Sequence, residues 1–161
     1  MKRFTYLLPA IIFFASCSNE SSNKPDPAET VDTVESSAPI VSEPPYNVEY
    51  DSVANVLRLK RRTDVGSATA GEMINLINDK YPGIKLDLVK AGTDTIELRI
   101  DDATKLSQQM GSAGAEAYLA ELTYSLTEVE GIKAISIDFE EGDHAMPGVY
   151  TRNDFKNLVG K

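Results

Sequence analysis

IKLDLVKAGTDTIELRID, residues 84–101, is the stretch that decides the fold. Apolar side chains occupy every second position on both sides of residues 92–94, at Ile84, Leu86, Leu88, Ile96, Leu98 and Ile100. This alternation predicts two strands that each bury one face. The Gly-Thr-Asp sequence between them predicts the turn of a β-hairpin. The hairpin has one apolar face that another element must cover.

A helix is predicted before the hairpin. Thr69 and Glu72 have the spacing of a capping box, in which each side chain accepts a hydrogen bond from the backbone amide of the other residue. The apolar side chains behind them follow the spacing of one helical face: Met73, Ile74, Ile77 and Tyr81. Pro82 and Gly83 then end the helix.

A second helix is predicted after the hairpin, with Ser112 as its N-cap. Its apolar stripe consists of Ala115, Leu119, Leu122, Leu126 and Val129. Gly131 lies where many helices end in a residue of positive φ, a conformation that glycine adopts without strain.

Further strands are predicted at residues 53–61, with Val53, Leu57 and Leu59 on one face, and at residues 135–139. Phe155, Leu158 and Val159 predict a short C-terminal helix. Residues 47–161 then have the order β-α-β-β-α-β, and their length suits one small core. The predicted class is α+β, a two-layer sandwich with two amphipathic helices on one face of a small mixed sheet. The strand order stays open, and a ferredoxin-like arrangement is one solution.

Residues 111–142, GSAGAEAYLAELTYSLTEVEGIKAISIDFEEG, resemble the GerMN domain of sporulation and spore-germination proteins. The shared features are a small-residue helix start at 111–113, a Ser-Leu-Thr-Glu turn at 125–128, and Gly-Ile-Lys at 131–133 before an apolar strand. The resemblance covers residues 53–143. GerMN domains occur in bacterial envelope proteins, often lipoproteins, so the resemblance implies a binding or assembly module. It implies no catalytic residue.

The N-terminus resembles a bacterial lipoprotein signal peptide. Two basic residues precede an apolar segment, residues 4–14, which is too short to cross a bilayer as a helix because a span needs about 20 residues. Phe14-Ala-Ser-Cys17 then resembles a lipobox. We expect residues 1–16 to be removed and Cys17, the only cysteine, to be lipidated. Several acyl chains on one residue give stable membrane anchoring.

Residues 17–46 are predicted to be the lipidated cysteine and a disordered tether. Ser, Glu, Asp and Pro dominate residues 18–46, so the segment cannot bury enough surface to fold. As a flexible coil, a segment of this length spans about 30 Å. The expected location is the cell envelope, outside the cytoplasm. Ser18 favours the outer membrane, because an Asp at that position often retains lipoproteins at the inner one.

The charge of the chain argues against two classes of partner. The formal net charge is −9, and removal of residues 1–16 takes away Lys2 and Arg3 and no acidic residue, which leaves −11. Nucleic acids and anionic lipid headgroups both require a basic footprint. Neither is expected as a direct partner.

Residues 140–155, EEGDHAMPGVYTRNDF, contain His144, the only histidine of the chain. One hypothesis is a small envelope hydrolase that uses His144 and Asp143 as an acid/base pair. A second is a calcium site made from the acids of residues 138–143, although their spacing is not that of an EF-hand. Neither a Gly-x-Ser-x-Gly nor a His-Glu-x-x-His motif is present, so no metal or cofactor is expected. A structural corner is favoured.

Tyr150, Arg152 and Phe155 extend this loop into a candidate binding surface with Asp143 and His144. Exposed aromatic residues beside an arginine are typical of binding hot spots. The alternative is that Tyr150 and Phe155 close one end of the core, since large aromatic side chains are mostly buried. We expect a non-enzymatic, membrane-anchored module that binds an envelope protein partner or peptidoglycan. Whether it forms a homo-oligomer stays open.

Overall fold

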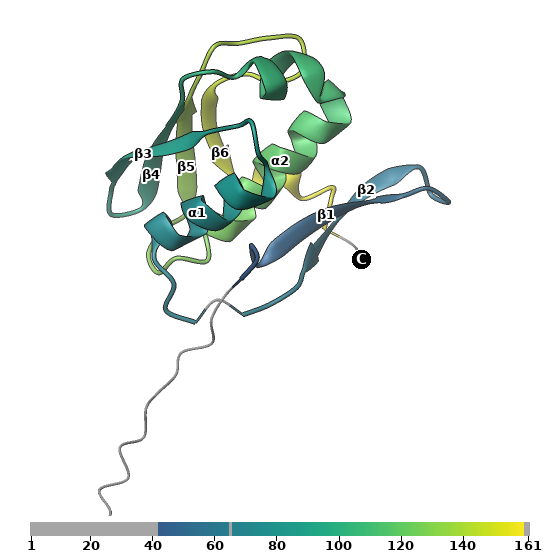
Figure 1. Cartoon of the computed structure of the whole chain (residues 1–161). Helices are drawn as coiled ribbons and strands as arrows, with labels where there is room; N and C mark the ends of the chain where they lie inside the picture. The colour runs from purple at the N-terminus through teal and green to yellow at the C-terminus, as the bar shows by residue number, and fades with distance from the viewer. Residues whose placement is uncertain (1–41, 65, 160–161) are drawn as a thin grey trace, which may run out of the picture. The chain divides into compact units, whose positions relative to one another are not determined.

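The computed structural model describes residues 42–64 and 66–159 and confirms the α+β class. In chain order the elements are β1 (Tyr46–Asp51), β2 (Val56–Arg61), α1 (Ala70–Lys80), β3 (Leu86–Ala91), β4 (Thr95–Ile100), the π-helical turn η1 (Lys105–Gln109), α2 (Gly111–Leu126), β5 (Ala134–Asp138), β6 (Gly148–Thr151) and the 3-10 turn η2 (Arg152–Phe155) (Figure 1). The predicted signal peptide, Cys17 and the predicted tether as far as residue 41 lie outside the described residues. No helix within the described ranges combines the length and the apolar character that a membrane span needs.

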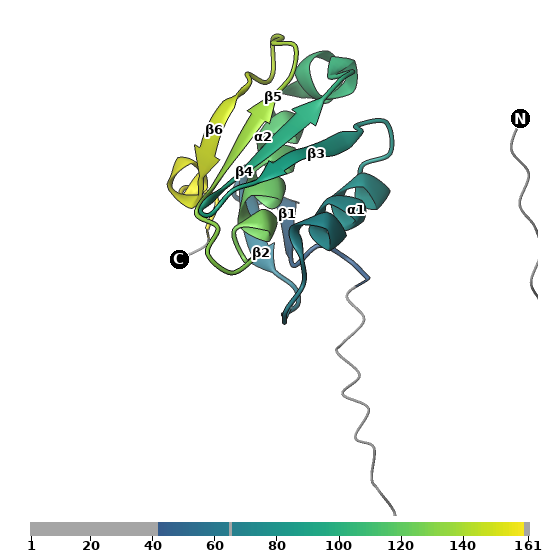
Figure 2. The ribbon, with the colours of Figure 1, turned by 90° about the vertical axis from the view of Figure 1, so that its left-hand side faces the viewer.

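The main sheet has four strands in the order β3-β4-β5-β6. β4 and β5 run parallel, whereas the β3–β4 and β5–β6 pairs are antiparallel. Figure 2 shows α1 and α2 on one face of this sheet. The predicted arrangement of two helices on one face of a small mixed sheet is therefore present.

β1 and β2 form a separate two-stranded sheet. Figure 1 shows α2 between this hairpin and the main sheet. Because α2 contacts other elements on both sides, all its residues from Tyr118 to Leu126 are buried. The structure differs here from the predicted single sheet. The strand predicted at residues 53–61 belongs to the separate hairpin, so no ferredoxin-like arrangement forms.

The observed strands differ from the predicted ones in two ways: one strand begins later than predicted, and two further strands are present. The strand predicted at residues 53–61 begins only at Val56, because residues 52–55 form the hairpin turn, in which Asn55 has a φ of 56°. Val53 is 97% exposed in that turn and does not share a buried face with Leu59. β1 and β6 are not among the predicted strands.

The start of α1 follows the predicted chemistry, whereas both ends of α2 differ from the prediction. The Glu72 amide donates to Thr69 Oγ1 at 3.3 Å, and the Thr69 amide donates to the Glu72 carboxylate at 2.7 Å, so the predicted capping box is confirmed. Gly131 has a positive φ, 84°, but it does not end the helix, because α2 already ends at Leu126 with Thr127 as its C-cap. Ser112 is not an N-cap. Met110 precedes the helix in a helical conformation, because η1 leads directly into α2.

The core contains most of the side chains that the alternating pattern selects. The buried members of the predicted hairpin are Ile84, Leu86, Ile96, Leu98 and Ile100. Leu88 is instead 42% exposed, because the pairing with β4 shifts between Leu88 and Lys90 at the edge of the sheet. Residues 44–46 are also buried, so the folded region includes the last residues that the sequence assigns to the tether.

Candidate functional site

Four of the five residues of the candidate binding surface line one groove: Asp143, His144, Tyr150 and Phe155. The groove has a volume of about 470 Å³. It lies between the N-terminal half of α2, the loop of residues 141–146, and the adjoining elements β6 and η2, which contribute Tyr150 and Phe155. Three stretches far apart in the sequence therefore meet at this groove.

The loop of residues 141–146 is fixed against η1 by a close backbone approach. The His144 amide donates to the Ser107 carbonyl at 3.0 Å, and the Gly142 amide donates to the Ala145 carbonyl at 3.1 Å. A Cβ atom at Gly142 would lie only 2.7 Å from the Ser107 carbonyl oxygen. Only glycine allows this approach. The predicted structural corner is thus a contact between the loop and η1.

The side chain of His144 is half-buried and contacts a serine. Its Nδ1 atom lies 3.2 Å from Ser112 Oγ, which is exposed in the first turn of α2. A hydroxyl both donates and accepts, so the contact suits either tautomer of the ring. The carboxylate of Asp143 makes no such contact with the ring among the described residues. The expected pairing of Asp143 with His144 is therefore replaced by a pairing of Ser112 with His144.

Aromatic rings form one wall of the groove. Tyr150 stacks on Phe155 with ring centroids 5.8 Å apart, and the Tyr150 hydroxyl donates to the Met146 carbonyl. Burial and the nearby Asp154 carboxylate raise the pKa of Tyr150. Phe155 is buried and therefore closes one end of the core, as one alternative predicted. Tyr150 is only half-buried, so part of its ring remains available for a binding surface, as the other alternative predicted. The Met146 side chain beside them is 60% exposed.

Three carboxylates border the groove: Glu116, Glu141 and Asp143. Within residues 42–64 and 66–159, none of the three forms an ion pair with a lysine or an arginine. The groove lining itself contains neither lysine nor arginine among these described residues. The site therefore combines apolar surface with three carboxylates that form no ion pair with a lysine or arginine of the described residues.

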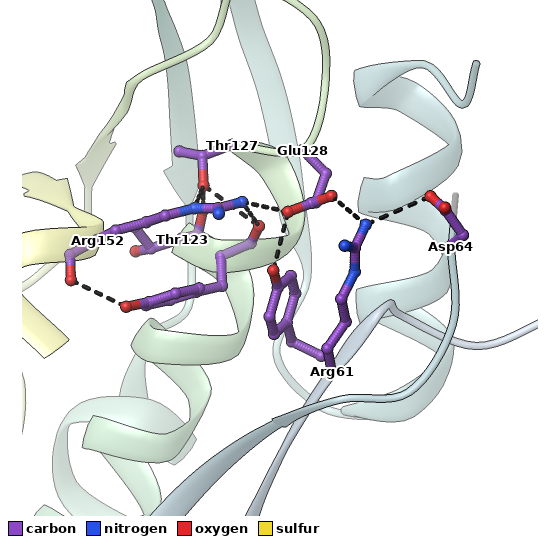
Figure 3. A network of polar contacts seen from close by, with 8 residues as sticks. Arg61, Asp64, Thr123, Thr127, Glu128 and Arg152 are labelled. Carbon is purple, nitrogen blue, oxygen red and sulfur yellow. Dashed lines mark hydrogen bonds and ion pairs between the residues drawn. The ribbon is translucent and has the colours of Figure 1, made fainter. Parts of the chain in front are cut away.

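Arg152 does not belong to this groove and is turned toward the end of α2. Its Nε atom donates to Thr127 Oγ1 at 2.7 Å, and its terminal nitrogen donates to the Tyr124 carbonyl at 3.1 Å and to the Glu128 carboxylate (Figure 3). The guanidinium group also lies 4.9 Å from the centre of the Tyr124 ring. The expected role of Arg152 as a free hot-spot residue needs correction, because two of its three guanidinium nitrogens donate hydrogen bonds within the fold.

Glu128 is the centre of this polar network, as Figure 3 shows. Besides Arg152, its carboxylate accepts hydrogen bonds from Tyr46 Oη at 2.9 Å and from Arg61 at 2.7 Å. Burial acts to raise the pKa of Glu128, but the hydrogen bonds from Arg152 and Tyr46 and the two guanidinium charges outweigh it, so the pKa is lowered. The network joins β1, β2, α2 and η2.

A second buried carboxylate, Glu121, lies on α2 with only 1% of its side chain exposed. It accepts hydrogen bonds from Lys80 Nζ and Tyr81 Oη, both at 2.6 Å, and from the Val48 amide. Burial, and then the Glu121 charge, raise the pKa of Tyr81. Glu121 is not among the residues predicted to form a site. Its signal is one acid inside the otherwise apolar run YLAEL of residues 118–122.

Metal-ligand geometry is not seen in the part of the chain that the structure describes. There, no three side chains of His, Cys, Asp or Glu come together closely enough to hold a metal ion. The acids of residues 138–143, which were one hypothesis for a calcium site, therefore form no such group of three in the described residues.

Comparison with known proteins adds no relative: no family model, no curated protein and no solved structure matches this chain. The resemblance to the GerMN domain therefore stays a prediction that rests on the motifs of residues 111–142.

Proposed function

We propose that this protein is a membrane-anchored envelope lipoprotein whose C-terminal domain binds a protein partner or peptidoglycan through the groove beside His144, without catalysing a reaction. The observation that carries the proposal is the groove itself. It has an apolar floor, an exposed Met146 and three carboxylates without an ion pair among the described residues, and it stands on a loop fixed by the Gly142–Ser107 approach. Fixed geometry lowers the entropy cost of binding.

The membrane anchor in this proposal rests on the sequence. Lipidation of Cys17 would hold the chain at a bilayer, and the residues between Cys17 and Tyr46 would separate the domain from it by about 30 Å. The acidic chain favours partners that are not themselves polyanions.

The alternative, a small envelope hydrolase, is favoured by one observation, the contact between Ser112 Oγ and His144 Nδ1. A serine nucleophile needs a base that a third group orients. In the described ranges, Ser112 provides the one side-chain hydrogen bond to the ring, so no third group orients the imidazole. The binding function therefore fits the geometry better.

In vivo photo-cross-linking tests the proposal. A benzophenone amino acid would replace Met146, which borders the groove, or Val53, which is 97% exposed in the distant hairpin turn. We expect a discrete protein adduct, or attachment to cell-wall sacculi, from position 146 and not from position 53. Identical products from both positions would contradict a role for the groove.

Two substitutions separate binding from hydrolysis. Ser112→Ala and His144→Gln remove the only hydroxyl–imidazole contact of the described structure while keeping side-chain volume close to native. Both residues line the groove, but each variant leaves its buried floor, Met146 and the three carboxylates in place, so a binding module still forms the cross-linked product at position 146. A hydrolase loses turnover of a chromogenic ester or of sacculi with either one.

A further inference from the structure

The charged side chains at the groove are of one sign. At other places on the domain some exposed carboxylates lie beside basic side chains, as Glu49 does beside Lys60 at 2.6 Å and Asp51 beside Arg58 at 2.8 Å, and others, such as Asp79 and Glu130, have no ion pair among the described residues. At the groove, Glu116, Glu141 and Asp143 have no such neighbour among the described residues. A concave surface lined by one sign of charge concentrates oppositely charged ligands.

The same groove offers apolar contact next to that charge. Leu119, Ala145 and Phe155 form its buried floor, at 5%, 6% and 5% exposure. Tyr150 adds a half-buried aromatic face, and such a face attracts cations. A ligand that fits must therefore present a positive charge beside an apolar group.

We propose that the groove binds a segment of a protein partner in which lysine or arginine side chains flank an apolar residue. The cations would lie against Glu116, Glu141 and Asp143, and the apolar side chain would lie against Met146 and the Tyr150 ring. This inference rests on the proposed function and deepens it. The proposed function allows either a protein partner or peptidoglycan. The groove favours the protein, because Glu116, Glu141 and Asp143 would repel the exposed carboxylates of a cell-wall polymer.

The test uses the full lipidated protein in nanodiscs of phosphatidylcholine and three fluorescein-labelled peptides. The first contains Lys-Phe-Lys, the second Glu-Phe-Glu and the third Lys-Ser-Lys, each between glycines. We expect measurable binding of the first by fluorescence anisotropy, weaker binding of the third, and none of the second. Empty nanodiscs give the blank. Affinity for the first peptide should fall as salt rises, because both partners are charged at an exposed site.

A matched pair of double variants assigns the binding to the groove. Glu141→Gln with Asp143→Asn removes two groove charges, and Asp79→Asn with Glu130→Gln removes two exposed charges elsewhere. Loss of two surface charge pairs weakens binding by about tenfold. We expect this loss for the groove variant only. Equal losses in both variants, or equal binding of the lysine and glutamate peptides, would overturn the inference.

The cross-linking experiment at Met146 separates this inference from the proposed function. A specific protein adduct at position 146 without binding of the lysine peptide would refute the cationic ligand and leave the binding role in place. A peptidoglycan product at position 146 would refute the choice of a protein partner. The same products from positions 146 and 53 would refute the binding role itself.

Discussion

Glu121 lies on α2 and Glu128 lies in the turn just after it, and both of their carboxylates accept hydrogen bonds from the β1–β2 hairpin. Glu121 accepts from the Val48 amide, and Glu128 accepts from Tyr46 and Arg61. Partners on α1 and η2, Lys80 and Arg152, neutralise the two charges. The hairpin is therefore held to the helix by two charged networks as well as by apolar contact.

Removal of Arg152 should destabilise the fold. Arg152→Ala leaves the largely buried Glu128 carboxylate with one cation fewer, and we expect a loss of about 2 kcal/mol in the free energy of unfolding. Arg99→Ala is the matched control, because its ion pair with Asp101 is exposed and should be worth less than about 1 kcal/mol. Urea denaturation measures both. Equal losses would show that the Glu128 network has no special role.

The buried pair of Glu121 and Lys80 should depend on both charges being present. Glu121→Leu alone leaves the Tyr81 hydroxyl and the Val48 amide without this acceptor, and it leaves the Lys80 ammonium with only Asn47 Oδ1, so we expect a loss of about 3 kcal/mol in the free energy of unfolding. Addition of Lys80→Met should recover part of this loss, since apolar replacement of a whole buried pair is often neutral. A double-mutant cycle, with each free energy of unfolding measured by urea denaturation, gives the coupling free energy between Glu121 and Lys80. Strictly additive losses would contradict a coupled pair.

The stability that Glu128 contributes should depend on pH. Its pKa in the folded protein lies below the ordinary value of 4.5, so the unfolded chain takes up a proton first as the pH falls. The contribution is present above pH 4.5 and is lost as the pH falls through the lower folded value. The stability difference between the native protein and Glu128→Gln should therefore shrink below pH 4.5. If the difference in the free energy of unfolding stays constant or grows on acidification, the pKa of Glu128 is not lowered in the folded protein.

Glycine should be required at position 142 and not at position 71. Gly142→Ala would place a Cβ 2.7 Å from the Ser107 carbonyl oxygen, so the loop must move, at a cost of about 1–3 kcal/mol. Gly71→Ala meets nothing within 4 Å inside α1 and should stabilise the protein by about 0.5 kcal/mol. Thermal unfolding compares the two. A neutral Gly142→Ala would show that the loop is not fixed by η1.

Cys17 should decide where the protein is found. Cys17→Ser removes the only thiol that can be acylated, so the variant should leave the detergent phase in a detergent-partition assay of envelope fractions. Metabolic labelling with a fatty-acid analogue should mark the native chain and not the variant. Membrane retention of an unlabelled native chain would contradict lipidation.

Local signals predicted most of the fold. The capping box of Thr69 and Glu72 and the alternation around residues 92–94 depend on near neighbours, and the structure confirms both. Gly131 has a positive φ as expected, but α2 ends five residues before it. β1 was harder to predict. Its alternating Tyr46, Val48 and Tyr50 directly follow a segment whose composition is typical of disorder.

Contacts across long sequence separations could not be predicted. The pattern of residues 140–155 placed Arg152 beside Tyr150, but its partner Glu128 lies on another element and no local period connects them. The same holds for Ser112 and His144. The β6 sequence Gly-Val-Tyr-Thr is too short to show an alternation of apolar and polar residues, so this edge strand of the sheet was not predicted.

The placement of the two hairpin contacts on α2 has a mechanical consequence. The chain that leads back to Cys17 joins β1 at Tyr46, which bonds Glu128 at the C-terminal end of α2, whereas the groove begins at Ser112 at the opposite end. Residues 112–126 of the helix span about 20 Å. A pulling force that arrives through the N-terminal segment is therefore transmitted to the far end of the helix through charged contacts. In the proposed lipoprotein, the contact that bears this load and the start of the groove at Ser112 would therefore lie at opposite ends of α2.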